Sequence, residues 1–278
     1  MNIYKFELKR AFKIPSFYLS LIVGCIITIV DWTVYALPQA QSLDVYMADM
    51  SKKSYPVSAF IMWIGGERSK FASLYFLILP LLVVVPYAHS FYTDNKSTYI
   101  NFIVTRVIKK EYFKAKFLAV FLSGGCVAVV PLILNFMMTA MVLPCVNIQT
   151  AMGGKLLPKS SFTEIYYNYP MLFVCISLLM IFIFAGIMAV SSLYIAFYSK
   201  WSFSVTLFPF ILSLVIMSVA DLSNMKAWEI MNFLNPVFQS PRFLPFIIEA
   251  VILLCIAVWE FIIKGSCQDC IWFYIKMD

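Results

Sequence analysis

The sequence predicts an all-α integral membrane protein with six transmembrane helices, an N-terminal amphipathic interfacial helix and both termini in the cytoplasm. Of its 278 residues, 62% are hydrophobic and only 13% are charged, whereas a soluble domain is about half apolar and about a quarter charged. The mean hydropathy is +0.87. The basic residues flank long uncharged runs, which is typical of membrane topology signals. This composition excludes disordered, fibrous and disulfide-stapled proteins, and we expect no nucleic-acid partner.

Residues 2–14 have the pattern of an amphipathic helix that precedes the first membrane span. Apolar side chains share one helical face and lysines share another (Tyr4, Leu8, Ala11 and Phe12; Lys5, Lys9 and Lys13). Pro15 ends or turns this helix. We expect it to lie in the membrane interface with its lysines toward anionic lipid. The alternative is an ordinary basic flank of the first span.

Six apolar segments are each long enough to cross the hydrocarbon core, which takes about 20 residues. The second of them contains Pro80 and Pro86, and the fourth contains small residues, among them Ala185 and Gly186, that favour close helix packing. The expected spans are 17–37, 71–89, 117–143, 171–197, 203–220 and 243–263. Together they form a single transmembrane domain over residues 1–278.

The connections between these spans differ in their content of Lys and Arg. With six spans, 13 of the 21 basic residues fall on the face that carries residues 1–14, residues 92–116, Lys200 and the C-terminal tail. The other face carries 8. Since cytoplasmic connections are enriched in basic residues, the first face is expected to be cytoplasmic.

The connection 92–116 combines apolar side chains with a high density of basic ones. Tyr99, Phe102 and Ile103 precede Arg106 and Lys109 in this segment. Exposed apolar clusters of this kind tend to mark a protein contact. The alternative is that the segment extends the third span as a helix, with basic side chains snorkelling at its rim.

Three acidic residues fall inside the expected spans, where an ionisable group is costly and tends to be functional. Asp31 lies beside Trp32, so it is either a hydrated carboxylate at the outer interface or a contact for substrate or gate. Glu260 precedes Lys264 by four positions and is interpreted as a structural pair. Glu249 has no basic residue at helical spacing within its span. It must therefore face a neighbouring helix, water or a substrate path, with a hydrogen-bonded packing role as the alternative.

Motifs for catalysis are absent from the sequence. There is no Gly-rich loop ending in Gly-Lys-Ser/Thr, no HExxH and no GxSxG, so neither ATP hydrolysis by that loop nor a catalytic residue is expected in this chain. Cys267 and Cys270 form a single CxxC, which could be half of a zinc site or a redox pair. We interpret them as two reduced, uncoordinated thiols and expect no metal or cofactor in this chain.

Several short segments resemble the permease subunits of bacterial type-2 ABC exporters. The opening Phe6–Arg10 precedes the first span, Asp94 follows the second span, and Leu234–Pro236 lies between the last two. Arg106, Tyr112 and Lys116 are similar to an Arg…Tyr…Lys pattern that leads into the third span of that family. With six spans and both termini inside, the resemblance covers nearly the whole chain.

This resemblance implies a coupling helix in the connection 92–116 that docks onto a cytoplasmic ABC ATPase, which would bind ATP and Mg²⁺. The residues expected to take part are Tyr99, Phe102, Ile103, Arg106, Lys109, Tyr112 and Lys116. It further implies a second permease subunit, identical or different, with the substrate path between the two subunits. The connection 222–242 would dip back into the outer leaflet.

The function expected from the sequence is that of a permease in the bacterial cytoplasmic membrane. It would export an amphipathic substrate such as a peptide, lipid or drug, driven by the ATPase partner. Asp31 and Glu249 are the candidate residues of the substrate path. The alternative is a stand-alone polytopic membrane protein, such as a secondary transporter.

Overall fold

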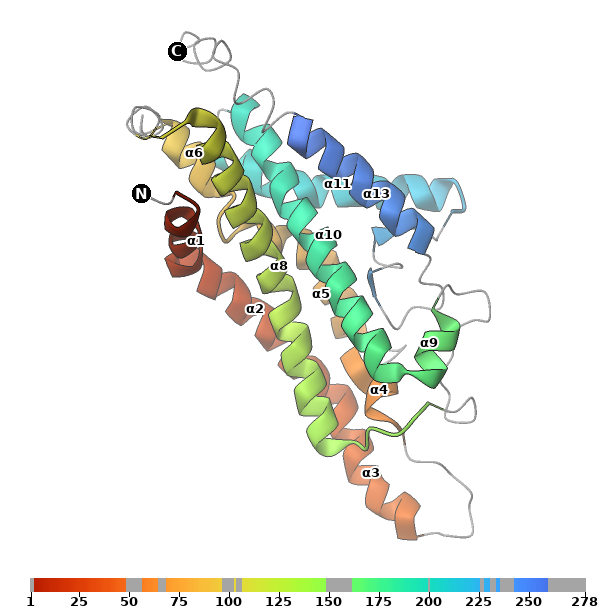
Figure 1. Cartoon of the computed structure of the whole chain (residues 1–278). Helices are drawn as coiled ribbons and strands as arrows, with labels where there is room; N and C mark the ends of the chain where they lie inside the picture. Colours follow the sequence, from red (N-terminus) through yellow and green to blue (C-terminus); the bar gives the residue numbers. More distant parts are fainter. Residues whose placement is uncertain are drawn as a thin grey trace.

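A computed structural model gives the fold of the chain. It describes residues 3–48, 57–64, 69–96, 103, 107–148, 162–199, 201–225, 228–230, 234–235 and 243–259. Within these ranges the regular structure is helical throughout (Figure 1). The predicted all-α class is therefore confirmed for the described part of the chain.

Four helical segments are long and apolar enough to cross a membrane. They are Pro15–Ser42, α8 (Lys109–Val142), Pro170–Ala196 within α10 (Pro170–Tyr198) and α11 (Ser202–Leu222). Two further apolar helices, α5 (Lys70–Val84) and α13 (Phe243–Ala257), have 15 residues each. These two lie where the second and sixth spans are expected, but each is shorter than the about 20 residues that a complete crossing takes. A membrane-embedded helical protein is therefore supported, whereas the count of six spans and the orientation remain predictions.

The centre of the bundle is formed by α8 and α10, which run side by side along its length (Figure 1). Small residues allow this close approach. A Cβ added at Gly124 of α8 would lie 2.6 Å from the Cβ of Ala189 on α10. On α10, Gly186 leaves room for the ring of Phe121 on α8 in the same way. The role predicted for small residues of the fourth span is confirmed by these contacts.

Helix α2 (Pro15–Asp31) packs against α5 and α8, while α13 packs against α10. In Figure 1, α11 lies across α10 near the end of the bundle that carries α1 and α6. The opposite end carries α3 and two short helices, α4 (Ala59–Met62) and α9 (Thr163–Asn168).

The first span is longer than predicted because α2 continues without interruption. A π-helical turn, η1 (Trp32–Ala36), connects it to α3 (Leu37–Ala48). The buried positions of α2 follow at intervals of three and four residues as far as Asp31, and the next buried position, Ala36, comes five residues later. A π turn places residues about five apart on one face, so η1 keeps Asp31 and Ala36 on the side of the helix that faces the bundle.

The second predicted span is broken near its end. Helix α5 stops at Val84, residues 85–88 form a turn that contains Pro86, and α6 (His89–Lys96) follows. Proline has no N–H for the helical ladder and its ring clashes with the preceding turn. The helix therefore stops before the expected residue 89, and the chain continues as the separate helix α6 to Lys96. Side chains of α6 contact the first turns of α8.

The third span also differs from its expected limits. Helix α8 begins at Lys109 rather than at residue 117, so residues 109–116 are helical and do not belong to a loop. The alternative interpretation, a helical extension of the span, is correct for this part of the connection. The amphipathic helix predicted at residues 2–14 is present as α1 (Ile3–Lys13), with Lys5, Lys9 and Lys13 exposed; its position in a membrane interface stays a prediction.

Candidate functional site

The described residues contain a buried cluster of charged side chains where α1, α6 and the first turns of α8 meet. Its members are Glu7, Arg10, Tyr87, Asp94, Tyr112 and Lys116, and we refer to them as the α1 clasp. Glu7 and Lys116 have no exposed surface, and Asp94 is 2% exposed. A buried charge is costly unless it is paired and hydrogen-bonded, so the partners of each member decide whether the cluster is stable.

Asp94 is the centre of the clasp. Arg10 donates to both of its carboxylate oxygens, from Nη1 at 2.9 Å and from Nη2 at 2.7 Å. Lys116 Nζ donates to Oδ2 at 2.7 Å, and the Tyr112 hydroxyl donates to the same oxygen at 3.2 Å. The carboxylate thus accepts four hydrogen bonds, three of them from cationic groups, which offsets the cost of its burial.

Glu7 is the second acid of the clasp. Lys116 Nζ lies 3.3 Å from Oε2, and Tyr87 donates its hydroxyl proton to the same oxygen. The ammonium group also lies 4.3 Å from the centre of the Tyr87 ring, within the range of a cation–π contact. The other oxygen, Oε1, lies 4.0 Å from Arg10 Nη1 and has no hydrogen-bond donor. Among the six residues of the clasp, the negative charges of Glu7 and Asp94 equal in number the positive charges of Arg10 and Lys116.

The environment of α1 changes the acidity of two of its side chains. Burial by itself would lower the pKa of Arg10, but the hydrogen bonds and the negative charge of Asp94 outweigh it and raise the pKa above its ordinary value. On the neighbouring turn, Tyr4 donates to Glu111 Oε2 of α8, and this hydrogen bond raises the pKa of Tyr4. Both residues therefore keep their protons at neutral pH and act as donors toward acids on other helices.

The clasp joins three segments that are far apart in the sequence. Arg10 and Asp94 are 84 positions apart, and Glu7 and Lys116 are 109 positions apart. Phe91 and Phe113 extend the contact between α6 and α8 with ring centroids 5.8 Å apart. Helix α6 precedes the connection 97–108 and α8 follows it, so the clasp joins the helices on both sides of that connection to α1.

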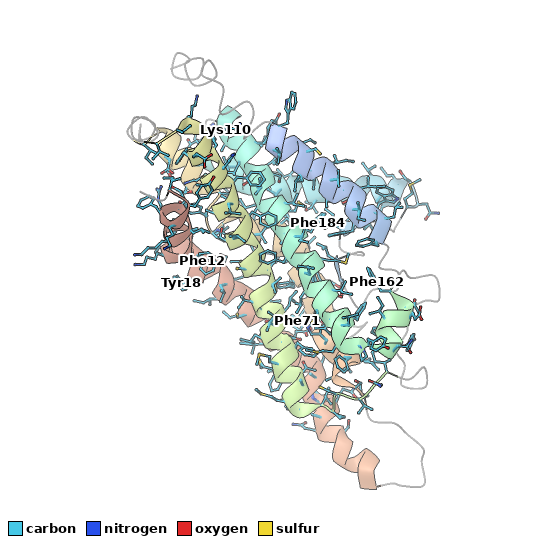
Figure 2. The ribbon with its side chains drawn as sticks, viewed as in Figure 1. Phe12, Tyr18, Phe71, Lys110, Phe162 and Phe184 are labelled. Carbon is cyan, nitrogen blue, oxygen red and sulfur yellow. The ribbon has the colours of Figure 1, made fainter. Side chains whose placement is uncertain are left out.

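The predicted coupling residues are distributed differently from what the sequence indicated. Tyr99, Phe102 and Arg106 lie outside the described residues, and Ile103 is 8% exposed. Lys109 is the first residue of α8, and Figure 2 shows its neighbour Lys110 at the start of that helix, by the α6 end of the bundle. Tyr112 and Lys116 are correctly placed near the connection, but both are fully buried in the clasp. These two side chains contact other residues of the chain, and their part in coupling to an ATPase stays a prediction.

Asp31, a predicted substrate-path residue, is 1% exposed and belongs to a second buried polar cluster. It accepts a hydrogen bond from Ser69, and Asn135 Nδ2 lies 3.3 Å from its Oδ2. Asn135 also donates to the Thr28 carbonyl at 2.9 Å and accepts from the backbone N–H of Ile64 at 3.0 Å. These hydrogen bonds enclose Asp31 within the chain, and its role as a contact for substrate or gate stays a prediction. It holds α2, the segment before α5 and α8 together.

Glu249, the other predicted substrate-path residue, has a different environment. It is 9% exposed and shares a face of α13 with Phe246, Ala250 and Leu253. The ring of Phe246 lies 6.0 Å from that of Phe184 on α10, so this face is turned toward α10. Oε2 of Glu249 is buried and has no hydrogen-bond partner. The face of α13 that carries Glu249 is thus turned toward α10, and its place on the substrate path stays a prediction.

Three other predictions fall on residues that the structure does not describe. Glu260, Cys267 and Cys270 lie outside the described ranges, as does most of the connection 222–242. Among the described residues, no group of three His, Cys, Asp or Glu side chains could hold a metal ion.

Glu7 and Asn135 were not among the predicted site residues. A usable signal existed for Glu7, which lies four positions from both Ile3 and Ala11 and is therefore on the buried face of α1. Asn135 is the polar amide in an otherwise apolar run of α8. A polar residue in such a run tends to hydrogen-bond to a neighbouring helix.

The helices indicate the general class of protein to which the chain belongs. In the part of the chain that the structure describes, it is an all-helical protein whose four long apolar helices suggest embedding in a membrane. Comparison of the chain with protein-family models, with curated proteins and with solved structures gives no match.

Proposed function

We propose that this protein is the transmembrane permease subunit of an ATP-driven ABC exporter in a bacterial cytoplasmic membrane. It would have six spans with both termini inside. A separate ABC ATPase would bind ATP and Mg²⁺, and a second permease subunit would complete the substrate path. An amphipathic peptide, lipid or drug would be moved outward by alternating access.

The observation that carries this proposal is the α1 clasp. It ties an interfacial helix to the residues on both sides of the connection 97–108, through Asp94 before it and Lys116 after it. An ATPase that moved this connection would therefore move α1, α6 and α8 together. Such a movement could shift the bundle between two states of different substrate affinity.

The exposed apolar surface supports a second permease subunit. On α13, Leu244 and Val251 are 65% and 53% exposed. Trp259, two residues beyond this helix, is 63% exposed, and Leu222 at the end of α11 is 88% exposed. In a membrane such surfaces contact lipid or another helix. A second subunit could pack against these exposed faces of α11 and α13, whereas Glu249 lies on the opposite face of α13, which is turned toward α10.

Co-purification in mild detergent tests the proposal. An ABC ATPase retained with the chain, with ATP hydrolysis that responds to substrate in reconstituted membranes, would support it. Charge reversal at Arg106 and Lys109 should then uncouple ATP hydrolysis from transport without unfolding the permease. The matched control is charge reversal at Lys5, an exposed residue of α1 outside the clasp. Wild-type coupling in the Arg106 and Lys109 variants would contradict docking at this connection.

Glu249 favours a second candidate, a stand-alone secondary transporter. A buried acid with an unpartnered oxygen in an apolar helix is typical of proton- or ion-coupled transport. Purified protein in proteoliposomes separates the two candidates. Transport driven by an ion gradient in the absence of ATP and of any ATPase would support the secondary transporter and overturn the ABC permease.

A further inference from the structure

A cavity of about 350 Å³ opens at the end of the bundle that carries α1. Residues from α1, α2, α6 and α11 line it, together with the turn after α5. This volume is at the lower end of the range found for small-molecule sites. The cavity therefore has room for a compact polar group.

The polar lining combines one cation with four hydroxyl groups. Arg10 contributes its guanidinium, and the hydroxyls belong to Ser16, Ser90, Thr93 and Thr206. Ser16 Oγ donates to the Pro86 carbonyl at 2.9 Å, and Ser90 Oγ donates to the Tyr87 carbonyl at 2.6 Å. A hydroxyl whose proton is used in this way still has an oxygen that can accept. The lining therefore suits a ligand that carries both an anionic group and hydrogen-bond donors.

An apolar stripe on α5 leads to this cavity. Leu74 is 41% exposed, and Ile78, Leu81 and Val85 follow it as half-buried residues at helical spacing. Val85 itself lines the cavity. Helix α5 packs against α2 and against α11, so the stripe lies between these two helices. A hydrocarbon chain laid along it would end at the polar lining.

The surroundings of the cavity have the character of a membrane interface. Lys9 and Lys13 are exposed on α1, which is amphipathic. Trp201, next to the first residue of α11, is 75% exposed. Lysine and tryptophan side chains favour the level of the lipid headgroups. A phosphate in the cavity would lie beside the Arg10 guanidinium, which Asp94 also shares, and α1 adds the positive charges of Lys9 and Lys13.

We propose that this cavity binds the headgroup of a phospholipid. The phosphate lies against Arg10, the ethanolamine or glycerol substituent donates hydrogen bonds to the hydroxyl oxygens, and one acyl chain follows the stripe on α5. Since Arg10 also belongs to the α1 clasp, the bound lipid stabilises the junction of α1 with α6. This inference does not depend on the transport proposal.

The test uses the full chain in a lipid-free non-ionic detergent, titrated with short-chain phospholipids. Thr206→Phe fills the cavity from α11 and leaves all six residues of the clasp unsubstituted. Ile211→Phe, at a 52% exposed position of the same helix, is the matched control. Short-chain phosphatidylethanolamine or phosphatidylglycerol is expected to raise the Tm of the wild type and of Ile211→Phe in a saturable way. Thr206→Phe should weaken this binding by about ten-fold or more. Thr206→Leu gives the same comparison if the larger side chain prevents folding.

Three further ligands decide the chemistry of the site. Diacylglycerol with the same chains lacks the phosphate headgroup, and inorganic phosphate lacks the acyl chains. Phosphatidylcholine has both but its choline group has no hydrogen-bond donor. The proposal expects a smaller Tm shift from each of them. An equal shift from any one of the three overturns it, as does a folded Thr206→Phe variant that binds phosphatidylethanolamine as tightly as the wild type.

Discussion

Arg10 holds Asp94 by two parallel hydrogen bonds, one from each terminal nitrogen to each carboxylate oxygen, at 2.9 and 2.7 Å. A planar guanidinium fixes both the distance and the orientation of a carboxylate in this arrangement. The bond therefore sets the position of α1 relative to α6 as well as tying the two helices together. The predictions below start from this contact and from the packing around it.

Lys116 should be the most sensitive basic residue of α8. Lys116→Met leaves Glu7 and Asp94 as buried acids with less compensation, and breaking a buried pair in this way costs about 3–5 kcal/mol. Lys114→Met is the control, because Lys114 pairs with Glu111 at 3.4 Å while being 42% exposed. An exposed pair of that kind contributes about 0–1 kcal/mol. Denaturant unfolding in detergent measures both, and equal losses would contradict the assigned burial of the clasp.

Asn135 should stabilise the other end of the bundle. Asn135→Leu leaves the backbone N–H of Ile64 and one oxygen of Asp31 without a donor or acceptor, and each buried unpaired group costs about 1–3 kcal/mol. Met137→Leu, at a 55% exposed position two residues further on, serves as the control. Thermal unfolding should show a large drop in Tm for the first variant only. If Asn135→Leu and the control variant have the same Tm, the hydrogen bonds of Asn135 do not stabilise the bundle.

Two adjacent glycines of α8 should differ in their tolerance of alanine. At Gly124 the added Cβ would meet the Cβ of Ala189 at 2.6 Å and the carbonyl oxygen of Val83 at 3.1 Å. At Gly125 it would meet the ring of Phe182 at 2.7 Å, and a side chain can rotate away. We expect Gly124→Ala to cost about 1–3 kcal/mol of unfolding free energy and Gly125→Ala to cost less. The reverse order of Tm values would show that the contact between α8 and α10 is not close at Gly124.

Glu249 should affect transport more than stability. Glu249→Gln removes a buried ionisable group that has an unpartnered oxygen, so the free energy of unfolding should stay constant or rise. Transport should fall if this carboxylate meets the substrate. Glu164→Gln, at an exposed position of α9, is the control. Folded yield and transport are measured together, and unchanged transport by a folded Glu249→Gln variant would exclude Glu249 from the substrate path.

The sequence was informative about what lies in the membrane and less so about what the polar residues do. Hydropathy located α2, α8, α10 and α11, because the exclusion of charge over about 20 residues is a strong local signal. The end of α5 was less well predicted, although Pro86 marks the break. The segment 109–116, expected in a loop, is helical, and Lys116 within it can be buried because Glu7, 109 positions away, compensates its charge. A contact between residues so far apart cannot be predicted from the spacing of residues within one segment.

The roles of the two candidate acids illustrate the same point. Both Asp31 and Glu249 are acids in apolar runs, and the sequence offered no way to separate them. The difference comes from their tertiary neighbours, since Asp31 meets Ser69 and Asn135 from other segments while Glu249 meets an apolar face of α10. Identical residue chemistry therefore led to one structural and one candidate functional site.

The π turn at Trp32–Ala36 means that the first span carries one residue more than an α-helix of the same register would need. Such a residue is equivalent to a single-residue insertion that the helix has absorbed locally. Val34, on the outward side and 47% exposed, is a residue whose removal this turn could accommodate. Deletion of Val34 should convert η1 into an α turn and still leave Asp31 and Ala36 facing the bundle. The same deletion at Ile26, within the regular part of α2, would rotate everything beyond it by about 100°.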